Sequence, residues 1–140
     1  MEAVVVFRIG SEHIGVDIKN VREVSEAGDL VFVPHSPEFL LGLVNMRGNV
    51  IPVVSLKKRL GISGEEEGNF LLIVEDKGRI AGLKVDELFG TQKIDKDNIN
   101  RNSKLISTKR EKDFFLGVYE NAEKPILLLN LERTLSKEDK

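Results

Sequence analysis

The 140-residue sequence contains no cysteine and no tryptophan. Without cysteine the chain can form no disulfide, thiolate metal site or cysteine nucleophile, which fits a protein of the reducing cytosol. No apolar run approaches the roughly 20 residues that a membrane-spanning helix needs. The N-terminus also lacks the basic flank and the small-residue cleavage site of a signal peptide. We therefore expect a soluble, cytoplasmic protein that does not insert into a membrane.

An excess of charge of one sign is missing too. The 21 basic and 23 acidic residues leave a net charge of −2, so no basic field favours nucleic acid or an anionic membrane as the partner. Barrels that bind single-stranded nucleic acid also need aromatic side chains for base stacking. The chain has one tyrosine and seven phenylalanines, and most phenylalanines fall at core positions. A β-barrel that binds single-stranded nucleic acid therefore remains only an alternative.

Motifs that carry chemistry are scarce. His13 and His35 adjoin turn residues and have no partner at ligand spacing, so we expect solvated loop histidines rather than metal ligands. The stretch 95–98 opens like a calcium loop, but Asn100 replaces the required glycine and Ile106 the closing glutamate. No phosphate-binding glycine loop, nucleophile elbow or paired-carboxylate motif is present. We expect no metal, no cofactor and no catalysis, with a small hydrolase or metal-dependent enzyme as the third option.

What the sequence does contain is a series of short apolar runs separated by turn residues. Helix signals are few: a turn or two starting at Ser36-Pro37-Glu38, one turn at 56–60 that Gly61 ends, and a C-terminal helix from Asn130. Many short strands with little helix predict an all-β barrel or sandwich. The expected strands are residues 4–9, 14–18, 21–24, 30–33, the two arms of a hairpin at 42–56, 70–74, 79–85, 91–94, 114–119 and 125–129.

The longest apolar run, residues 42–56, is the centre of this pattern. Its single polar interruption is Arg47-Gly48-Asn49, and a two-residue loop through Gly48-Asn49 predicts a hairpin because both residues tolerate positive φ. The second arm is apolar at nearly every position, so we expect both of its faces to be covered. Pro52 has no N–H for a ladder, which predicts a sheet edge or a bulge there.

This run resembles the signature of the CheW-like family of chemotaxis coupling proteins. The family pattern is glycine, aliphatic, asparagine, aliphatic, arginine-glycine, followed by a run that ends in aliphatic-aspartate-leucine. One departure is plain, because Ser55 stands where the family usually has an aspartate. The matching stretches, which together cover most of the chain, are 42–48, 50–56, 15–18, 21–24 and 81–86.

The resemblance implies a single domain, residues 1–140, made of two small five-stranded Src-homology-3-like β-barrels that share a core. We place the division between these subdomains near 61–69 and leave open whether the C-terminal part returns to the first barrel. A faint internal repeat agrees with two barrels, since 14–21 aligns with 81–88 around one shared glycine. Neither half is large enough to be stable alone, so the interface between them should be apolar.

For function, the resemblance implies a non-catalytic adaptor that couples transmembrane chemoreceptors to the histidine kinase CheA. It would associate with membrane receptor arrays through these partners. A specialised CheW-like scaffold of another two-component pathway is the related alternative. The cytoplasmic tip of the receptor would dock in an apolar groove between the barrels, near the Arg-Gly turn. The receptor-binding positions that carry over are Val21, Glu23, Arg47 and Ile80.

Two of these positions, Arg47 and Glu23, are expected to lie close enough to pair. Burial in an ordinary core remains the alternative for Val21 and Ile80, and a solvated surface charge is the alternative for Glu23 and Arg47. The regulatory domain of CheA has the same fold and would bind an exposed edge of the first barrel, because an unpaired strand edge can accept a homologous barrel. The kinase-binding positions are Val31, Val33 and Pro34.

Overall fold

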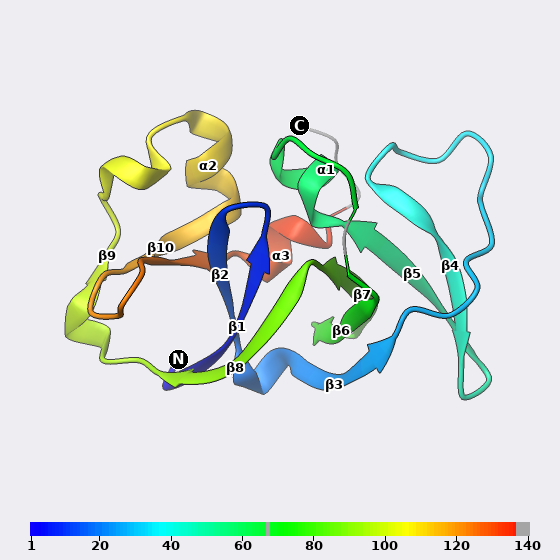
Figure 1. Cartoon of the computed structure of the whole chain (residues 1–140), viewed down its shortest axis with the longest axis horizontal. Coiled ribbons are helices and arrows are strands. Elements are labelled where there is room, and N and C mark those ends of the chain that lie inside the picture. Colours follow the sequence, from blue (N-terminus) through cyan, green and yellow to red (C-terminus); the bar gives the residue numbers. More distant parts are fainter. Residues whose placement is uncertain (67, 137–140) are drawn as a thin grey trace.

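The computed structural model describes residues 1–66 and 68–136, and these form two β-sheets with short helices (Figure 1). The six-stranded sheet has the order β8-β1-β2-β11-β10-β9 and the five-stranded sheet the order β3-β6-β7-β5-β4. The strands of the first are β1 (Ala3–Ile9), β2 (Glu12–Asp17), β8 (Glu87–Lys93), β9 (Ile99–Asn100), β10 (Phe115–Tyr119) and β11 (Ile126–Leu129). Those of the second are β3 (Val21–Glu26), β4 (Leu40–Met46), β5 (Asn49–Ser55), β6 (Phe70–Asp76) and β7 (Arg79–Val85).

The helices are short and lie between strands or after the last one. They are α1 (Leu56–Leu60), α2 (Lys109–Phe114) and α3 (Leu131–Thr134), with 3₁₀ turns η1 (Ile18–Asn20), η2 (Lys96–Asn98) and η3 (Lys104–Ile106). None of the helices within the described residues is long and apolar enough to cross a bilayer.

The predicted all-β fold with two Src-homology-3-like barrels is confirmed, and both sheets follow one plan. Each has an antiparallel hairpin, β1–β2 or β6–β7, whose second strand pairs in parallel with a strand distant in sequence. Gly15 on β2 faces Leu128 on β11, and Gly82 on β7 faces Val53 on β5. The two glycines of the sequence repeat therefore occupy equivalent places in the two sheets.

Three apolar clusters hold the molecule together. The largest combines buried side chains of both sheets, including Phe7 of β1 and Leu83 of β7. A smaller cluster around Val4 and Ile126 lies within the six-stranded sheet, and another around Val53 and Ile73 lies within the five-stranded sheet. Each barrel thus has its own interior and also contributes to a common core.

The chain crosses between the sheets at two points. It leaves the six-stranded sheet through η1, forms all five strands of the other sheet, and returns at Asp86, between β7 and β8. The C-terminal strands β8 to β11 therefore lie with β1 and β2. Residues 61–66 and 68–69 lie between α1 and β6, and the strands on either side of them, β5 and β6, belong to the same sheet.

The segment between β3 and β4 differs from the prediction. No helix follows Ser36, because its hydroxyl donates to the Val33 carbonyl (2.7 Å) instead of accepting from a helical N–H. Residues 30–33 do not form a strand either, and only Val31 makes an isolated bridge, to Leu43 of β4. Figure 1 shows this segment as a long loop that runs outside β4.

Two further expectations about short elements have different outcomes. The turn at 56–60 is confirmed as α1, which ends at Gly61 with a left-handed φ of 74°. Pro52 is not in an edge strand, because β5 lies between β4 and β7, but the pairing of β4 with β5 does shift register next to it, between Leu40 and Gly42. Its missing N–H is tolerated because pairing of β5 with β7 begins only at Val53.

Candidate functional site

The turn between β4 and β5 places Arg47 at the surface. Met46 pairs with Asn49, so the two loop residues are Arg47 and Gly48, with φ values of 52° and 85°. The prediction of a Gly48-Asn49 turn is therefore wrong by one residue. The amide of Gly48 donates to the side-chain oxygen of Asn45 (3.1 Å), which helps to fix the turn at this register.

The guanidinium of Arg47 reaches across to the opposite edge of the five-stranded sheet. Its Nη1 atom lies 2.7 Å from Oε2 of Glu23 on β3, which confirms that the two side chains are close enough to pair. Because β3 and β4 are the two edges of this sheet, the contact shows that the sheet curls until its edges meet at this end. Arg47 is exposed and Glu23 half-buried, so solvent screens the pair and its own contribution to stability is small, about 0–1 kcal/mol.

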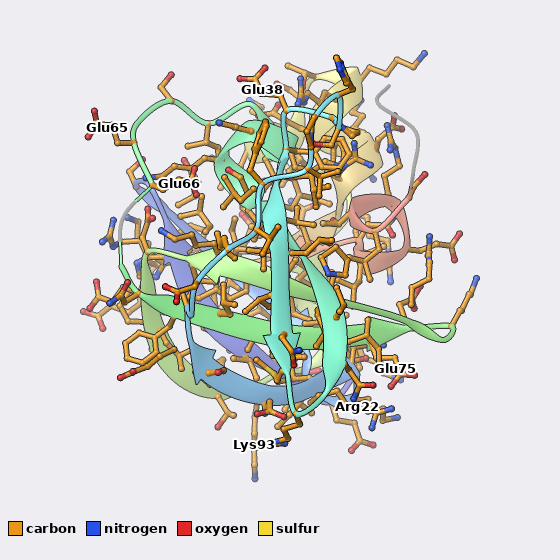
Figure 2. The ribbon with its side chains drawn as sticks, turned by 90° about the vertical axis from the view of Figure 1, so that its right-hand side faces the viewer. Arg22, Glu38, Glu65, Glu66, Glu75 and Lys93 are labelled. Atoms are coloured by element: carbon orange, nitrogen blue, oxygen red, sulfur yellow. The ribbon has the colours of Figure 1, made fainter. Side chains whose placement is uncertain are left out.

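Val21 and Ile80 lie at the same end of the sheet but in different surroundings. Val21 pairs with Val74, which pairs in turn with Ala81, and Val21 packs partly against the common core. Ile80 is 42% exposed and pairs with Glu75. Glu75 forms an ion pair with Arg22 of β3, and Figure 2 shows these two side chains together.

A mainly apolar cavity of about 500 Å³ opens next to Ile80. Of the four predicted receptor-binding residues, Ile80 is the one that lines it. The sequence analysis did not predict the other residues that line the cavity, because they come from segments far apart in the chain. These segments are the loop before β4, the strands β4, β5 and β7, and the end of α3. The lining residues are Pro37, Phe39, Leu40, Pro52, Val54, Arg79, Ile80, Ala81, Thr134, Leu135 and Ser136.

The C-terminal wall of this cavity is held by two arginines. Arg79 donates to the carbonyls of Leu135 (3.2 Å) and Glu132 (3.3 Å). Arg59 is buried and donates to carbonyls at the end of α3, including Thr134 (3.2 Å), while its guanidinium lies 4.0 Å from the centre of the Phe39 ring. These contacts fix residues 132–136 against β7 and α1.

Of the predicted kinase-binding residues, Val31 lies against the outer edge of β4, and Val33 and Pro34 follow it in the loop before β4. Val31 donates to the carbonyl of Leu43 (2.8 Å) and accepts from its amide (2.9 Å). Its side chain is 65% exposed, Val33 is half-buried and Pro34 is exposed. Phe32, which the sequence prediction passed over, is 72% exposed. The sequence analysis expected a strand at 30–33. In a strand successive side chains point to opposite faces, so Phe32 would have faced away from Val31 and Val33.

The histidines differ from each other. His35 is exposed in a turn, as expected, but His13 lies on β2 with its ring centre 4.7 Å from that of Phe89. Burial, followed by the charge of Lys124, lowers the pKa of His13 below its ordinary value. Among residues 1–66 and 68–136, no group of three or more His, Cys, Asp or Glu side chains is arranged to hold a metal ion.

Similarity to known proteins identifies the family of this chain. Residues 3–139 match the model of the CheW-like domain. The protein named "Probable chemotaxis protein CheW" from Rhizobium etli is 30% identical over 135 residues, which cover 95% of this chain and 86% of that protein. Chemotaxis protein CheW from Helicobacter pylori is 28% identical over 134 residues, covering 94% and 80%. The crystal structure of the scaffolding protein TtCheW from Thermoanaerobacter tengcongensis has a TM-score of 0.88 at 33% identity and covers 99% of this chain and 90% of its own.

Proposed function

The chain belongs to the CheW-like family, and from this premise we propose that it is a non-catalytic adaptor that couples chemoreceptors to the histidine kinase CheA in the cytoplasm. The observation that carries the proposal is the Arg47–Glu23 pair. The family's Arg-Gly motif here forms a surface turn whose cation is oriented by a carboxylate from another strand. The exposed Ile80 of the same sheet lines an apolar cavity.

The receptor footprint comprises Val21, Glu23, Arg47 and Ile80. These residues share one end of the five-stranded sheet, where the apolar cavity adjoins Ile80. Such a groove suits the apolar face of a helix, and the helical tip of a receptor presents one. Burial of the apolar residues would supply most of the affinity, while the ion pair at the rim would select the orientation of the helix.

The kinase footprint comprises Val31, Val33 and Pro34, and we extend it to the exposed Phe32. The bridge from Val31 to Leu43 covers only one position of the outer edge of β4. Because a loop runs outside β4 (Figure 1), the partner would bind the exposed apolar side chains of this loop, Val31 and Phe32, rather than add a strand directly to β4. The regulatory domain of CheA is the partner proposed for it.

A ternary binding experiment tests the proposal. The purified chain is titrated by calorimetry with a soluble chemoreceptor tip fragment, with a CheA regulatory domain, and with each in the presence of the other. An adaptor binds both at once, so saturation with one partner leaves the affinity for the other unchanged or higher. Competition between the partners, or no binding of either, contradicts the proposal. A single-stranded oligonucleotide is the matched negative ligand, and its binding would support the nucleic-acid alternative instead.

A further inference from the structure

Ser55, the residue that departs from the family pattern, is completely buried where β5 passes into α1. Its side chain is 0% exposed. Its Oγ atom accepts a hydrogen bond from the amide of Lys58 (3.2 Å), so Ser55 caps the start of α1. A serine can cap a helix as an aspartate does, but it brings no negative charge to this position.

A carboxylate reaches the same place from another part of the chain. The hydroxyl of Ser55 donates to Oε2 of Glu66 (2.8 Å), a residue of the loop that follows α1. Figure 2 shows Glu66 on this loop, with its neighbour Glu65 directed outward. Glu66 therefore brings a carboxylate from the loop to the Ser55 hydroxyl at the start of α1.

The same loop covers a buried ion pair. The ammonium group of Lys57 lies 3.0 Å from Oδ2 of Asp86, and the two side chains are 2% and 3% exposed. Lys57 also donates to the backbone carbonyl of Glu65. A buried pair of this kind is stable only while water is excluded and its remaining polar atoms are satisfied.

Asp86 connects the two sheets. It lies at the point where the chain returns from β7 to β8, and its Oδ2 atom accepts from the amide of Gly10 (2.7 Å) in the β1–β2 turn. Lys57 belongs to α1, next to the five-stranded sheet. The other end of the loop also passes close to Asp86, because a Cβ added at Gly68 would lie 2.5 Å from the Asp86 carbonyl oxygen.

We propose that residues 61–66 form a strap that closes over the Lys57–Asp86 pair and thereby locks the two sheets together, and that Glu66 holds the strap in place through Ser55. The strap is an internal device of this chain, and it does not depend on the proposed receptor or kinase footprints. Release of Glu66 exposes the ion pair to water, which weakens the attraction between the charges and loosens the junction at Gly10.

The first test compares Glu66→Ala with Glu65→Ala. Both variants lose one loop carboxylate, but Glu65 contacts Lys57 through its backbone carbonyl, which alanine retains. Amide hydrogen exchange of Gly10, whose N–H is bound to Asp86, reports opening of the junction. We expect exchange in Glu66→Ala to be about tenfold faster than in the parent, as loss of a charged hydrogen bond implies, and no change in Glu65→Ala. Equal exchange in the two variants overturns the proposal.

The second test moves the carboxylate of this contact from position 66 to position 55. Ser55→Asp alone places two carboxylates together and should lower the melting temperature. Ser55→Asp combined with Glu66→Gln should recover it, because the glutamine amide can donate to the new aspartate. If the double variant is no more stable than Ser55→Asp, Glu66 does not hold the strap. Receptor and kinase titrations on Glu66→Ala separate this result from the proposed function, because loss of the strap leaves both footprints in place.

Discussion

At the scale of single residues, Arg47 combines a costly backbone conformation with an exposed charge. A non-glycine residue with left-handed φ costs about 1–2 kcal/mol. Strain alone does not mark a functional site here, because the β6–β7 turn has the same form, with φ values of 52° at Lys77 and 83° at Gly78. What distinguishes Arg47 is its pairing with Glu23 and its place in the family motif.

Replacing Arg47 by glycine separates the two properties. Arg47→Gly removes the guanidinium but relaxes the backbone, so the free energy of unfolding from urea denaturation should stay the same or rise by up to about 1 kcal/mol. Affinity for the receptor tip should fall at least tenfold, which is about 1.4 kcal/mol.

Lys77→Gly is the matched control for this substitution. It relaxes an equivalent turn and loses a cation that pairs with Glu132 at the surface, yet it should leave receptor affinity unchanged. If Arg47→Gly binds the receptor as well as Lys77→Gly does, Arg47 contributes nothing to recognition.

The Arg47–Glu23 contact could be predicted because the family resemblance implies that both positions belong to the receptor-binding groove, but the exact turn could not. Arg47-Gly48 and Gly48-Asn49 both contain the glycine that a two-residue hairpin loop favours. The register of β4 against β5, with Met46 opposite Asn49, decides between them, and the Asn45 side chain helps to hold it by accepting from the Gly48 amide. The cavity lining was beyond prediction, since Leu40, Pro52 and Leu135 meet only in the folded chain.

At the scale of elements, α2 forms although the sequence analysis did not predict it, and the helix predicted after Ser36 does not form. A capping box needs Glu or Gln three residues after the capping Ser or Thr. Thr108 has Glu111 at that position, and both reciprocal hydrogen bonds form at the start of α2. Ser36 has Phe39 there, with Glu38 one residue too early, and no helix forms. The sequence prediction weighed the proline at 37 and overlooked this spacing.

The capping box makes the stability of α2 dependent on pH. The hydrogen bond from the amide of Thr108 holds the pKa of Glu111 below its ordinary value, despite partial burial that acts the other way. A lowered pKa in the folded protein stabilises it above the ordinary glutamate pKa of about 4.3. That contribution is lost as the pH falls through the lower pKa of the folded state.

Accordingly, Glu111→Gln should reduce the difference in urea midpoint between pH 7 and pH 3.

Thr108→Ala should lower the free energy of unfolding by about 1 kcal/mol at pH 7. Ser107→Ala is the control, since Ser107 reaches Glu111 through its backbone amide, at 3.1 Å. A Thr108→Ala variant as stable as Ser107→Ala would show that the capping box does not stabilise the protein.

At the scale of the whole molecule, the two-barrel architecture was foreseen from the family resemblance rather than from local pattern. Each sheet depends on a parallel pairing between distant strands, β2 with β11 and β5 with β7. Local propensity carries no information about such pairings. In the sequence, the matching glycines Gly15 and Gly82 were the one indication that the two sheets are alike. The crossings between the sheets follow from these pairings, so they too had to come from the structure.

The common core predicts that the sheets unfold together. Leu83 is fully buried in the cluster that both sheets share, so Leu83→Ala should cost about 2–5 kcal/mol. Amide exchange in β1 and β6, one strand from each sheet, should accelerate by the same factor. Faster exchange confined to β6 would mean that the two barrels open independently.

An adaptor must hold both partners at once, so the two footprints must be separable by substitution. Ile80 lies on β7 and Val31 beside β4, with β5 and β4 between them. Both side chains are exposed, at 42% and 65%, so a charge at either position should be tolerated by the fold.

Ile80→Asp should weaken receptor binding at least tenfold, because a carboxylate replaces an apolar contact worth about 1.5–3 kcal/mol, and should leave kinase binding unchanged. Val31→Asp should do the reverse, since well-separated sites behave almost additively. Phe89→Asp, an exposed position on the other sheet, is the control and should affect neither titration. One substitution that abolishes both interactions in a protein still folded by circular dichroism would refute the two-surface model, because a single shared surface cannot couple a receptor to a kinase.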